Sequence, residues 1–201
     1  MAGFLPEVWI ARHGETPWTI STQHTGRTDV PLTAGGEAEA LRLRAALAGV
    51  SFARVWTSPL VRATRTCELA GFGDRAELDP DLREWDYGDF EGLTHAEILA
   101  RRPDWVVFRD GSPGGESVAD VSARADRVIA RLRALDGDTL LFGHGHFSRA
   151  LGARWIGLPV LGATRLLLAT AAVSVLGYDH NLDEAAIRLW NDRHHLNGGV
   201  G

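Results

Sequence analysis

The sequence has no lysine, a single cysteine and no long apolar run. All 21 basic side chains are arginine, a bias of composition that decides nothing about mechanism. The net charge is −5 and the isoelectric point is near 5.9, so the chain lacks the basic face or tail typical of a non-specific nucleic-acid binder. We therefore do not expect nucleic acid as a partner.

Cys67 has no second cysteine to pair with, which excludes an intramolecular disulfide and a cluster of thiolate metal ligands. The N-terminal stretch MAGFLPEVWI contains no basic segment, and residues 158–177 are interrupted by proline, glycine and arginine. Neither a signal peptide nor a membrane span is indicated. These absences predict a cytoplasmic protein with no membrane partner.

The hydrophobic content of 45% over 201 residues suffices for one good core, so we expect residues 1–201 to form a single domain. Short apolar runs predict strands at 8–11, 53–57, 139–143, 173–178 and 186–190. Helical spacing predicts helices at 34–48, 59–71 and 118–135. Ser58 and Ser117 are the expected N-caps of the last two helices, with Asp120 at capping-box distance from Ser117.

Strands and helices that alternate in this way are typical of a mostly parallel sheet with helices on both faces. The last two strands flank the polar stretch DHNLDE, which predicts an antiparallel edge. The expected fold is α/β, a three-layer α/β/α sandwich with a mostly parallel central sheet, one antiparallel edge and a small helical cap. The cap is expected at about 93–117, where residues 105–108 either belong to it or pack as core.

Basic side chains follow three of the predicted strands. The first strand ends in Arg12-His13-Gly14, the second leads to Arg62 one turn into the next helix, and the third ends in His144-Gly145-His146. Ligands of parallel sheets bind outside the carboxyl ends of the strands, so we expect these groups to converge. A desolvated cluster of like charge implies a bound polyanion, and phosphate suits guanidinium groups best.

Metal binding is the competing use of these histidines. His144 and His146 could place two ligands at one strand end, but no carboxylate is close to them in the sequence and the flanking arginines repel a cation. We therefore expect no metal site. His194 and His195 lie in NDRHHLNGGVG, which is typical of a frayed or tag-like terminal tail.

An anion site that cleaves an ester also needs a proton donor for the leaving oxygen. Glu84, in the stretch LREWDYGDFEGLT, lies between apolar neighbours and is a candidate for this role. Judged from the residues alone, Asp86, Asp89 and Glu91 are equally available.

Taken together, the motifs resemble those of the histidine phosphatase superfamily, also called phosphoglycerate mutase-like, in the order typical of that family. The resemblance covers roughly residues 8–180 and rests on Arg12-His13-Gly14-Glu15-Thr16, Thr25-Gly26, Thr57-Ser58-Pro59-Leu60-x-Arg62-Ala63, Leu82-x-Glu84, Gly88-x-x-Glu91-Gly92, Pro113-Gly114-Gly115-Glu116-Ser117 and Gly143-His144-Gly145. The stretches DPDLREWDYGDFEGLT, FRDGSPGGES and HGHFSRAL are most similar to the branch that contains broad acid phosphatases and sedoheptulose-bisphosphatase-like enzymes. The mutase branch is less similar.

The resemblance implies a role for each matched residue. His13 would attack phosphorus and form a phosphohistidine, and Glu84 would first protonate the leaving oxygen and then activate water. The implied groups that neutralise the phosphate are Arg12, Arg62 and His144, assisted by backbone amides near Thr25-Gly26 and at Gly145. No metal or organic cofactor is implied.

Specificity is expected to come from donors beside these motifs. We expect Tyr87, His146 and Arg149 on the leaving-group side, with His24 and His180 as further candidates, although Arg149 could equally be a charge on a helix surface. Thr19 stands where family members often have asparagine, and its hydroxyl is expected to bind a phosphate oxygen less well.

The sequence thus predicts a metal-independent phosphomonoesterase that acts on a small phosphorylated substrate. A mutase-type phosphotransfer enzyme and a non-catalytic phosphate-binding module are the alternatives. A homodimer through an edge strand stays open.

Overall fold

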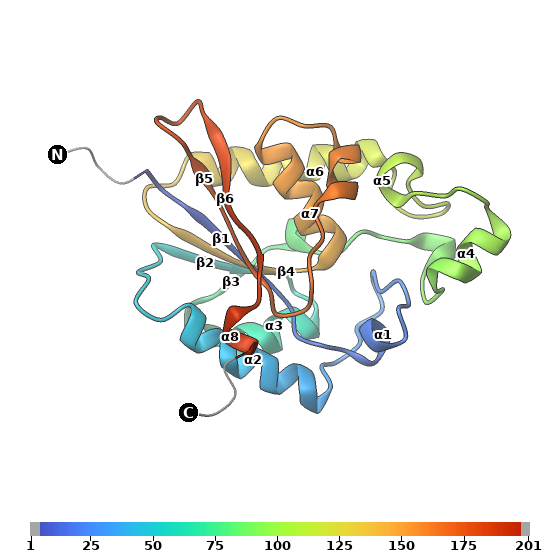
Figure 1. Cartoon of the computed structure of the whole chain (residues 1–201), viewed down its shortest axis with the longest axis horizontal. Coiled ribbons are helices and arrows are strands. Elements are labelled where there is room, and N and C mark those ends of the chain that lie inside the picture. The colour runs from blue at the N-terminus through green and yellow to red at the C-terminus, as the bar shows by residue number, and fades with distance from the viewer. Residues whose placement is uncertain (1–4, 198–201) are drawn as a thin grey trace.

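In the computed structural model, which describes residues 5–197, six strands form one sheet in the order β3-β2-β4-β1-β5-β6 (Figure 1). The strands are β1 (Val8–Arg12), β2 (Arg54–Thr57), β3 (Glu77–Leu78), β4 (Thr139–Gly143), β5 (Val173–Tyr178) and β6 (Ala185–Asp192). β1, β2, β3 and β4 pair in parallel, whereas β5 runs antiparallel to both β1 and β6. The predicted mostly parallel sheet with an antiparallel edge is confirmed.

Helices cover both faces of this sheet, because neighbouring strand residues point to opposite faces. On one face, Ile10 and Leu141 pack with α6 (Val118–Arg133) and α7 (Gly145–Trp155). On the other face, Ala11 and Phe142 pack with α2 (Ala34–Ala46) and α3 (Val61–Leu69). In Figure 1 the sheet lies between these two helix pairs, which is the expected three-layer sandwich.

The segment predicted as a cap contains α4 (His95–Arg101) and α5 (Val107–Asp110). α4 lies on the same side of the molecule as the short α1 (Pro17–Ile20), toward the carboxyl ends of the parallel strands (Figure 1). A β-bridge joins Gln23 to Thr94 and so ties the two segments together. Trp105, Val107 and Phe108 are buried in the larger core cluster.

Several boundaries differ from the prediction. β3 was not predicted, because its two residues are exposed and form no apolar run. The helix expected from residue 59 begins at Val61 with Leu60 as N-cap, since the Ser58 hydroxyl lies 2.8 Å from His144 Nε2. The capping box of Ser117 with Asp120 is confirmed.

The C-terminal segment is more ordered than a frayed tail. His194 begins α8 (His194–Asn197), and Leu196 packs against the core cluster beneath α2. The rest of the predicted tail, 198–201, lies outside the described residues. Between residues 5 and 197, every helix falls short of the length and apolarity that crossing a membrane requires.

Candidate active site

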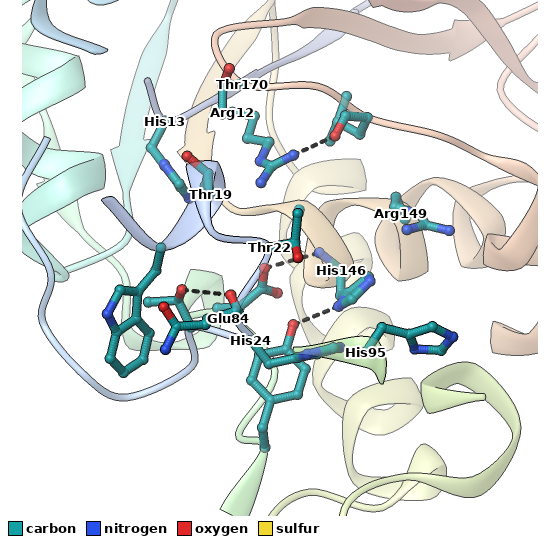
Figure 2. A pocket seen from close by; sticks show the side chains of 16 residues that line it. Arg12, His13, Thr19, Thr22, His24, Glu84, His95, His146, Arg149 and Thr170 are labelled. Atoms are coloured by element: carbon teal, nitrogen blue, oxygen red, sulfur yellow. Dashed lines mark hydrogen bonds between the residues drawn. The ribbon is translucent and has the colours of Figure 1, made fainter. Parts of the chain in front are cut away.

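A cavity of about 510 Å³ opens beyond the carboxyl end of β1. Its walls come from the C-terminal end of β1, the N-terminal part of α7, the α1 segment, the loop around Glu84, the start of α4 and the loop before β5. The 16 lining residues are Arg12, His13, Trp18, Thr19, Thr22, Gln23, His24, Thr25, Glu84, Tyr87, His95, Gly145, His146, Arg149, Leu168 and Thr170 (Figure 2). The predicted convergence of basic groups therefore exists, with one carboxylate among them.

His13 is buried at the end of β1, and its ring has a defined orientation. Nδ1 lies 2.7 Å from the carbonyl oxygen of Gly14, which can only accept, so Nδ1 carries the proton. Burial, together with the positive charges of Arg12 and Arg62, holds the pKa of His13 well below its ordinary value. The ring is therefore neutral near pH 7, and its Nε2 has a free lone pair.

Arg12 lies beside His13 on the cavity wall and is only partly engaged by the protein. Nη1 donates to the carbonyl oxygen of Leu168, while the buried Nε has no hydrogen-bond partner among residues 5–197. A Cβ atom at position 145 would lie 3.3 Å from Arg12 Cζ, so Gly145 gives the guanidinium group room against α7. Arg12 is thus available for an anion in the cavity.

His144 lies behind His13 rather than on the cavity wall. The two ring centroids are 5.2 Å apart, and His144 is fully buried. Its Nε2 lies 2.8 Å from Ser58 Oγ, and its Nδ1 accepts from Arg62 Nε at 3.2 Å. Both nitrogens of the ring expected to contact phosphate are therefore engaged by protein groups. Burial keeps the pKa of His144 well below its ordinary value.

Arg62 also lies beneath the cavity, where it holds the loop that carries Thr25. Its Nη atoms donate to the carbonyl oxygens of Thr25, Gly26 and Thr28 at 2.9–3.0 Å. The prediction that the Gly26 amide would assist phosphate binding is wrong, because this N–H donates to the Glu91 carboxylate at 2.8 Å. The loop presents Thr25 to the cavity but turns the Gly26 amide away from it.

The side chain of Glu84 lies against the N-terminal end of α7, and its carboxylate accepts hydrogen bonds from three backbone N–H groups. Oε1 accepts from Trp85 at 2.9 Å and from Phe147 at 2.7 Å, and Oε2 accepts from His146 at 3.0 Å. The surroundings of this group are therefore polar, not apolar as its sequence neighbours suggested. His144, the N-cap residue of α7, makes no side-chain capping hydrogen bond. Glu84, from a different segment of the chain, caps the N-terminus of α7 instead.

Two histidines and a tyrosine form the side of the cavity away from His13. Tyr87 Oη lies 2.5 Å from His146 Nδ1, and the His24 ring meets the Tyr87 ring edge-on at 4.9 Å. Burial lowers the pKa of His146 and of His24 and raises that of Tyr87. With both groups neutral, Tyr87 donates to His146 Nδ1, so His146 Nε2 carries a proton.

Arg149 is part of this wall rather than a charge on the outer helix surface. Its Nε and Nη2 donate to the carbonyl oxygen of Ala163 at 3.1 and 3.0 Å, and its guanidinium group lies over the Phe108 ring at 4.6 Å. Burial lowers the pKa of Arg149. Both hydrogen bonds to Ala163 use the same edge of the Arg149 guanidinium group.

Two of the polar groups expected in the site are used elsewhere. The Thr19 hydroxyl donates to the Thr16 carbonyl oxygen and accepts from the Thr16 N–H, both at 2.8 Å, and so caps α1 instead of offering its proton to phosphate. His180 was expected near the leaving group but lies in the exposed turn between β5 and β6. There its Nδ1 is 2.8 Å from Glu184 and 3.1 Å from Asp179.

Other lining residues were not predicted. His95, the first residue of α4, belongs to none of the recognised motifs, and neither do Thr22 and Thr170. The β-bridge between Gln23 and Thr94 brings His95 to the cavity, and this pairing leaves no trace in the local sequence. A polar residue next to a motif is the only signal that could have pointed to them.

Three buried neutral histidines predict that stability falls in acid. The folded-state pKa values of His13, His144 and His146 lie well below 6.5, so below about pH 6.5 the unfolded chain binds protons that the folded chain does not. Each such histidine costs about 1.4 kcal/mol per pH unit in that range. We expect the melting temperature to drop steeply from pH 7.5 to pH 5.5 at constant ionic strength, and a flat profile would contradict the burial of these rings as neutral groups.

Comparison with known proteins is consistent with this geometry. A family model described as the histidine phosphatase superfamily (branch 1) matches residues 8–193. The chain is 40% identical over 187 residues to an acid phosphatase of Mycobacterium tuberculosis, covering 89% of each sequence. It is 35% identical over 192 residues to the sedoheptulose 1,7-bisphosphatase of Saccharomyces cerevisiae, covering 80% of this chain and 71% of the relative.

A solved structure agrees with the fold. The structure of an open reading frame product of Mycobacterium tuberculosis superposes with a TM-score of 0.88 at 37% identity, over 92% of this chain and 97% of the other. The sheet and the helices that form the cavity therefore have a counterpart in an experimentally determined relative.

Proposed function

Because the chain belongs to the histidine phosphatase superfamily (branch 1) and is a phosphomonoester hydrolase, we propose that it cleaves small sugar or organic phosphates through a covalent intermediate on His13. One observation carries this proposal. The imidazole of His13 is neutral, its Nδ1 proton is held by the Gly14 carbonyl oxygen, and Nε2 is left as a nucleophile at a cavity that also contains Arg12 and Glu84.

In the first half-reaction, Nε2 of His13 attacks phosphorus in line. The bond from nitrogen to phosphorus forms as the ester bond from phosphorus to oxygen breaks, and Glu84 gives its proton to the departing oxygen. The positive charge that develops on the ring is stabilised by the hydrogen bond from Nδ1 to Gly14. The products of this step are a free alcohol, a phosphohistidine and a Glu84 carboxylate.

In the second half-reaction, water replaces the alcohol. The Glu84 carboxylate takes a proton from water as its oxygen attacks phosphorus, and the bond from phosphorus to His13 breaks. Inorganic phosphate leaves, His13 returns as a neutral ring, and Glu84 is again protonated. One carboxyl group serves both halves of the cycle.

Guanidinium groups take the part that a metal ion plays in many other phosphoryl-transfer enzymes. Arg12 faces the cavity and neutralises the equatorial phosphate oxygens. Behind it, Arg62 donates to His144, whose ring centroid lies 5.2 Å from that of His13. Direct contact of Arg62 or His144 with phosphate would require one of their hydrogen bonds to open. The proposal therefore includes catalysis without a metal or an organic cofactor.

The leaving-group side supports a polar substrate. His146 Nε2–H and Arg149 offer donors suited to sugar hydroxyls or to a second phosphate, whereas His24 and Tyr87 line the same wall with their protons held by Leu93 and His146. Residues 93–117 contribute His95 as part of a cap. This composition agrees with relatives named sedoheptulose 1,7-bisphosphatase and acid phosphatase.

Replacing Arg149 with alanine is expected to separate bisphosphates from simple monoesters. A charge-assisted hydrogen bond contributes about 1.5–3 kcal/mol, so KM for a sugar bisphosphate should rise by about 10- to 100-fold while KM for a simple monoester changes little. Arg154→Ala is the matched control, because Arg154 lies on the same helix but pairs with Asp126 at the surface. Equal effects of Arg149→Ala on both substrates would remove Arg149 from the second-phosphate role.

The decisive test is hydrolysis of a panel of phosphate esters in excess chelator, with and without a second alcohol as acceptor. We expect chelator-resistant release of inorganic phosphate. Transfer of most of the phosphoryl group to the added alcohol would favour the mutase alternative. Turnover that the chelator abolishes would contradict the metal-independent mechanism, and the absence of turnover on every ester would favour a binding module.

A further inference from the structure

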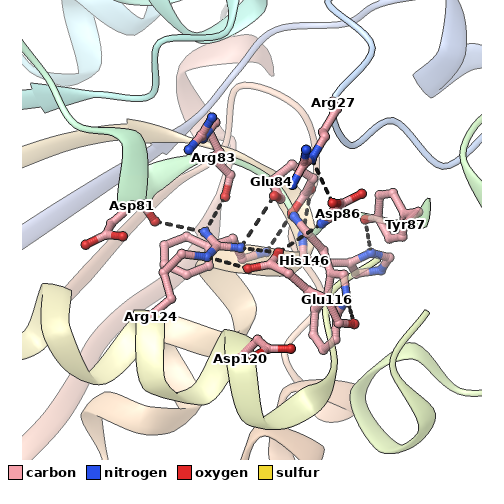
Figure 3. Close-up of polar contacts among 12 residues, drawn as sticks. Arg27, Asp81, Arg83, Glu84, Asp86, Tyr87, Glu116, Asp120, Arg124 and His146 are labelled. Atoms are coloured by element: carbon pink, nitrogen blue, oxygen red, sulfur yellow. Dashed lines mark hydrogen bonds and ion pairs between the residues drawn. The ribbon is translucent and has the colours of Figure 1, made fainter. Parts of the chain in front are cut away.

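Arg124 is a charged side chain buried in the middle of α6. Its side chain is 9% exposed, whereas the side chains of Arg127 and Arg131 on the same helix are 58% and 45% exposed. A charge is buried at a large cost in desolvation unless its environment supplies partners. The partners of Arg124 all belong to the surroundings of Glu84 (Figure 3).

The guanidinium group holds the main chain that leads to Glu84. Nη1 donates to the carbonyl oxygens of Asp81 and Arg83 at 2.8 and 2.6 Å, and Nη2 lies 3.4 Å from the carbonyl oxygen of Glu84 itself. Three carbonyl groups within four residues thus point at one side chain. These hydrogen bonds fix the backbone of the turn that leads into Glu84, the proposed acid.

Glu116 fixes the main chain on the other side of Glu84. It pairs with Arg124 through two hydrogen bonds of 2.8 and 2.7 Å. Its Oε2 also accepts from the Asp86 N–H, its own N–H donates to the Asp86 carbonyl oxygen, and its carbonyl oxygen accepts from Trp85 Nε1, each at 2.9–3.0 Å. The segment 81–86 is therefore tied to the pair before and after Glu84.

Arg124 also reaches the group that holds the carboxylate. Its guanidinium group lies 4.0 Å from the centre of the Phe147 ring, and the Phe147 N–H donates to Glu84 Oε1 at 2.7 Å. One side chain therefore contacts both the main chain that bears Glu84 and the residue that fixes its carboxylate. A surface ion pair such as that between Arg127 and Asp81 makes no such connection.

We propose that Arg124 and Glu116 are positioning residues that hold Glu84 at the distance and angle needed for proton transfer. This inference rests on the proposed role of Glu84 as acid and base. Neither residue lines the cavity that contains His13, so both act through Glu84 and not on the substrate. Displacement of a catalytic group by about 1 Å can cost about 100-fold in rate, which is the scale of effect expected.

The test compares esters that differ in their need for an acid. Hydrolysis of p-nitrophenyl phosphate releases a stable phenolate, whereas an alkyl phosphate releases an alkoxide that must be protonated. Arg124→Lys keeps the charge but loses the planar fork. We expect it to lower kcat/KM by about 10- to 100-fold for the alkyl phosphate and by less than about 3-fold for p-nitrophenyl phosphate. Glu116→Gln should give the same pattern and carries the test if Arg124→Lys does not fold.

Two reference variants separate the possible failures. Arg127→Ala removes a partner of Asp81 from the same helix and should leave both esters unaffected. Glu84→Gln should show the largest difference between the two esters in the loss of kcat/KM. Equal losses for both esters in Glu84→Gln would overturn the acid role of Glu84 itself. If Glu84→Gln discriminates but the Arg124 and Glu116 variants lose both esters equally, or lose neither, the positioning role is wrong.

Discussion

Replacing His13 with alanine is expected to lower kcat for every phosphate ester by about 10⁴-fold or more. The reason is that the nearest imidazole cannot replace it: His144 is fully buried and has both nitrogens engaged by Ser58 and Arg62. Removal of the covalent nucleophile alone has effects of this order, because the other catalytic groups act on a covalent intermediate that can no longer form.

The intermediate itself can be observed. Rapid quenching of the wild type with ³²P-labelled ester should yield a label that survives alkali and is lost in acid, as expected of phosphohistidine, and His13→Ala should yield none. His180→Ala is the matched control, since His180 lies in the exposed turn between β5 and β6 and should leave turnover and labelling unchanged. Normal labelling in His13→Ala would show that the nucleophile is a different residue.

Replacing Glu84 with glutamine is expected to have the second largest effect, because one residue serves both half-reactions. General acid and base catalysis contributes about 10²- to 10⁴-fold, so kcat for an alkyl phosphate should fall within that range. With p-nitrophenyl phosphate, the first step needs little acid but the second still needs a base. A burst of p-nitrophenol followed by slow turnover is therefore expected in stopped-flow measurements.

The same substitution should also lower stability. The Glu84 carboxylate caps α7, and an amide nitrogen at either carboxylate oxygen would face a backbone N–H, donor against donor. Loss of a helix cap costs about 1 kcal/mol, which denaturant melts can resolve. Asp89→Asn, an exposed acidic residue of the same segment, should change neither activity nor stability. A kinetic effect of Asp89→Asn as large as that of Glu84→Gln would reopen the choice of acid.

Much of the fold followed from the sequence, because buried strands and amphipathic helices leave local patterns. The runs at 139–143 and 173–178 coincide with β4 and β5, where every residue is buried, and the helix from Val118 begins at its predicted capping box. The convergence of Arg12, His13 and Glu84 at one cavity followed from strand ends and from matched motifs.

What the sequence missed depends on contacts between distant segments. The Gly26 amide could not be excluded from phosphate binding without knowing that Glu91 accepts from it, and the Thr19 hydroxyl required the capping geometry of α1. His95 reaches the cavity only through the pairing of Gln23 with Thr94. None of these partners is marked by spacing or composition near the residue concerned.

The position of β1 inside the sheet has a consequence for the order of folding. β1 carries His13 at its end, yet Val8 lies opposite Thr139 on one side and opposite Leu176 on the other. Pairings between segments so far apart in the chain are slow to form, because closing the long loop costs conformational entropy before any stabilising contact is made. During synthesis, the strand that bears the nucleophile emerges before β4 and β5 and can pair with them only after they have left the ribosome. The catalytic centre is therefore among the last parts of the molecule to exist, although it is encoded near the start of the chain.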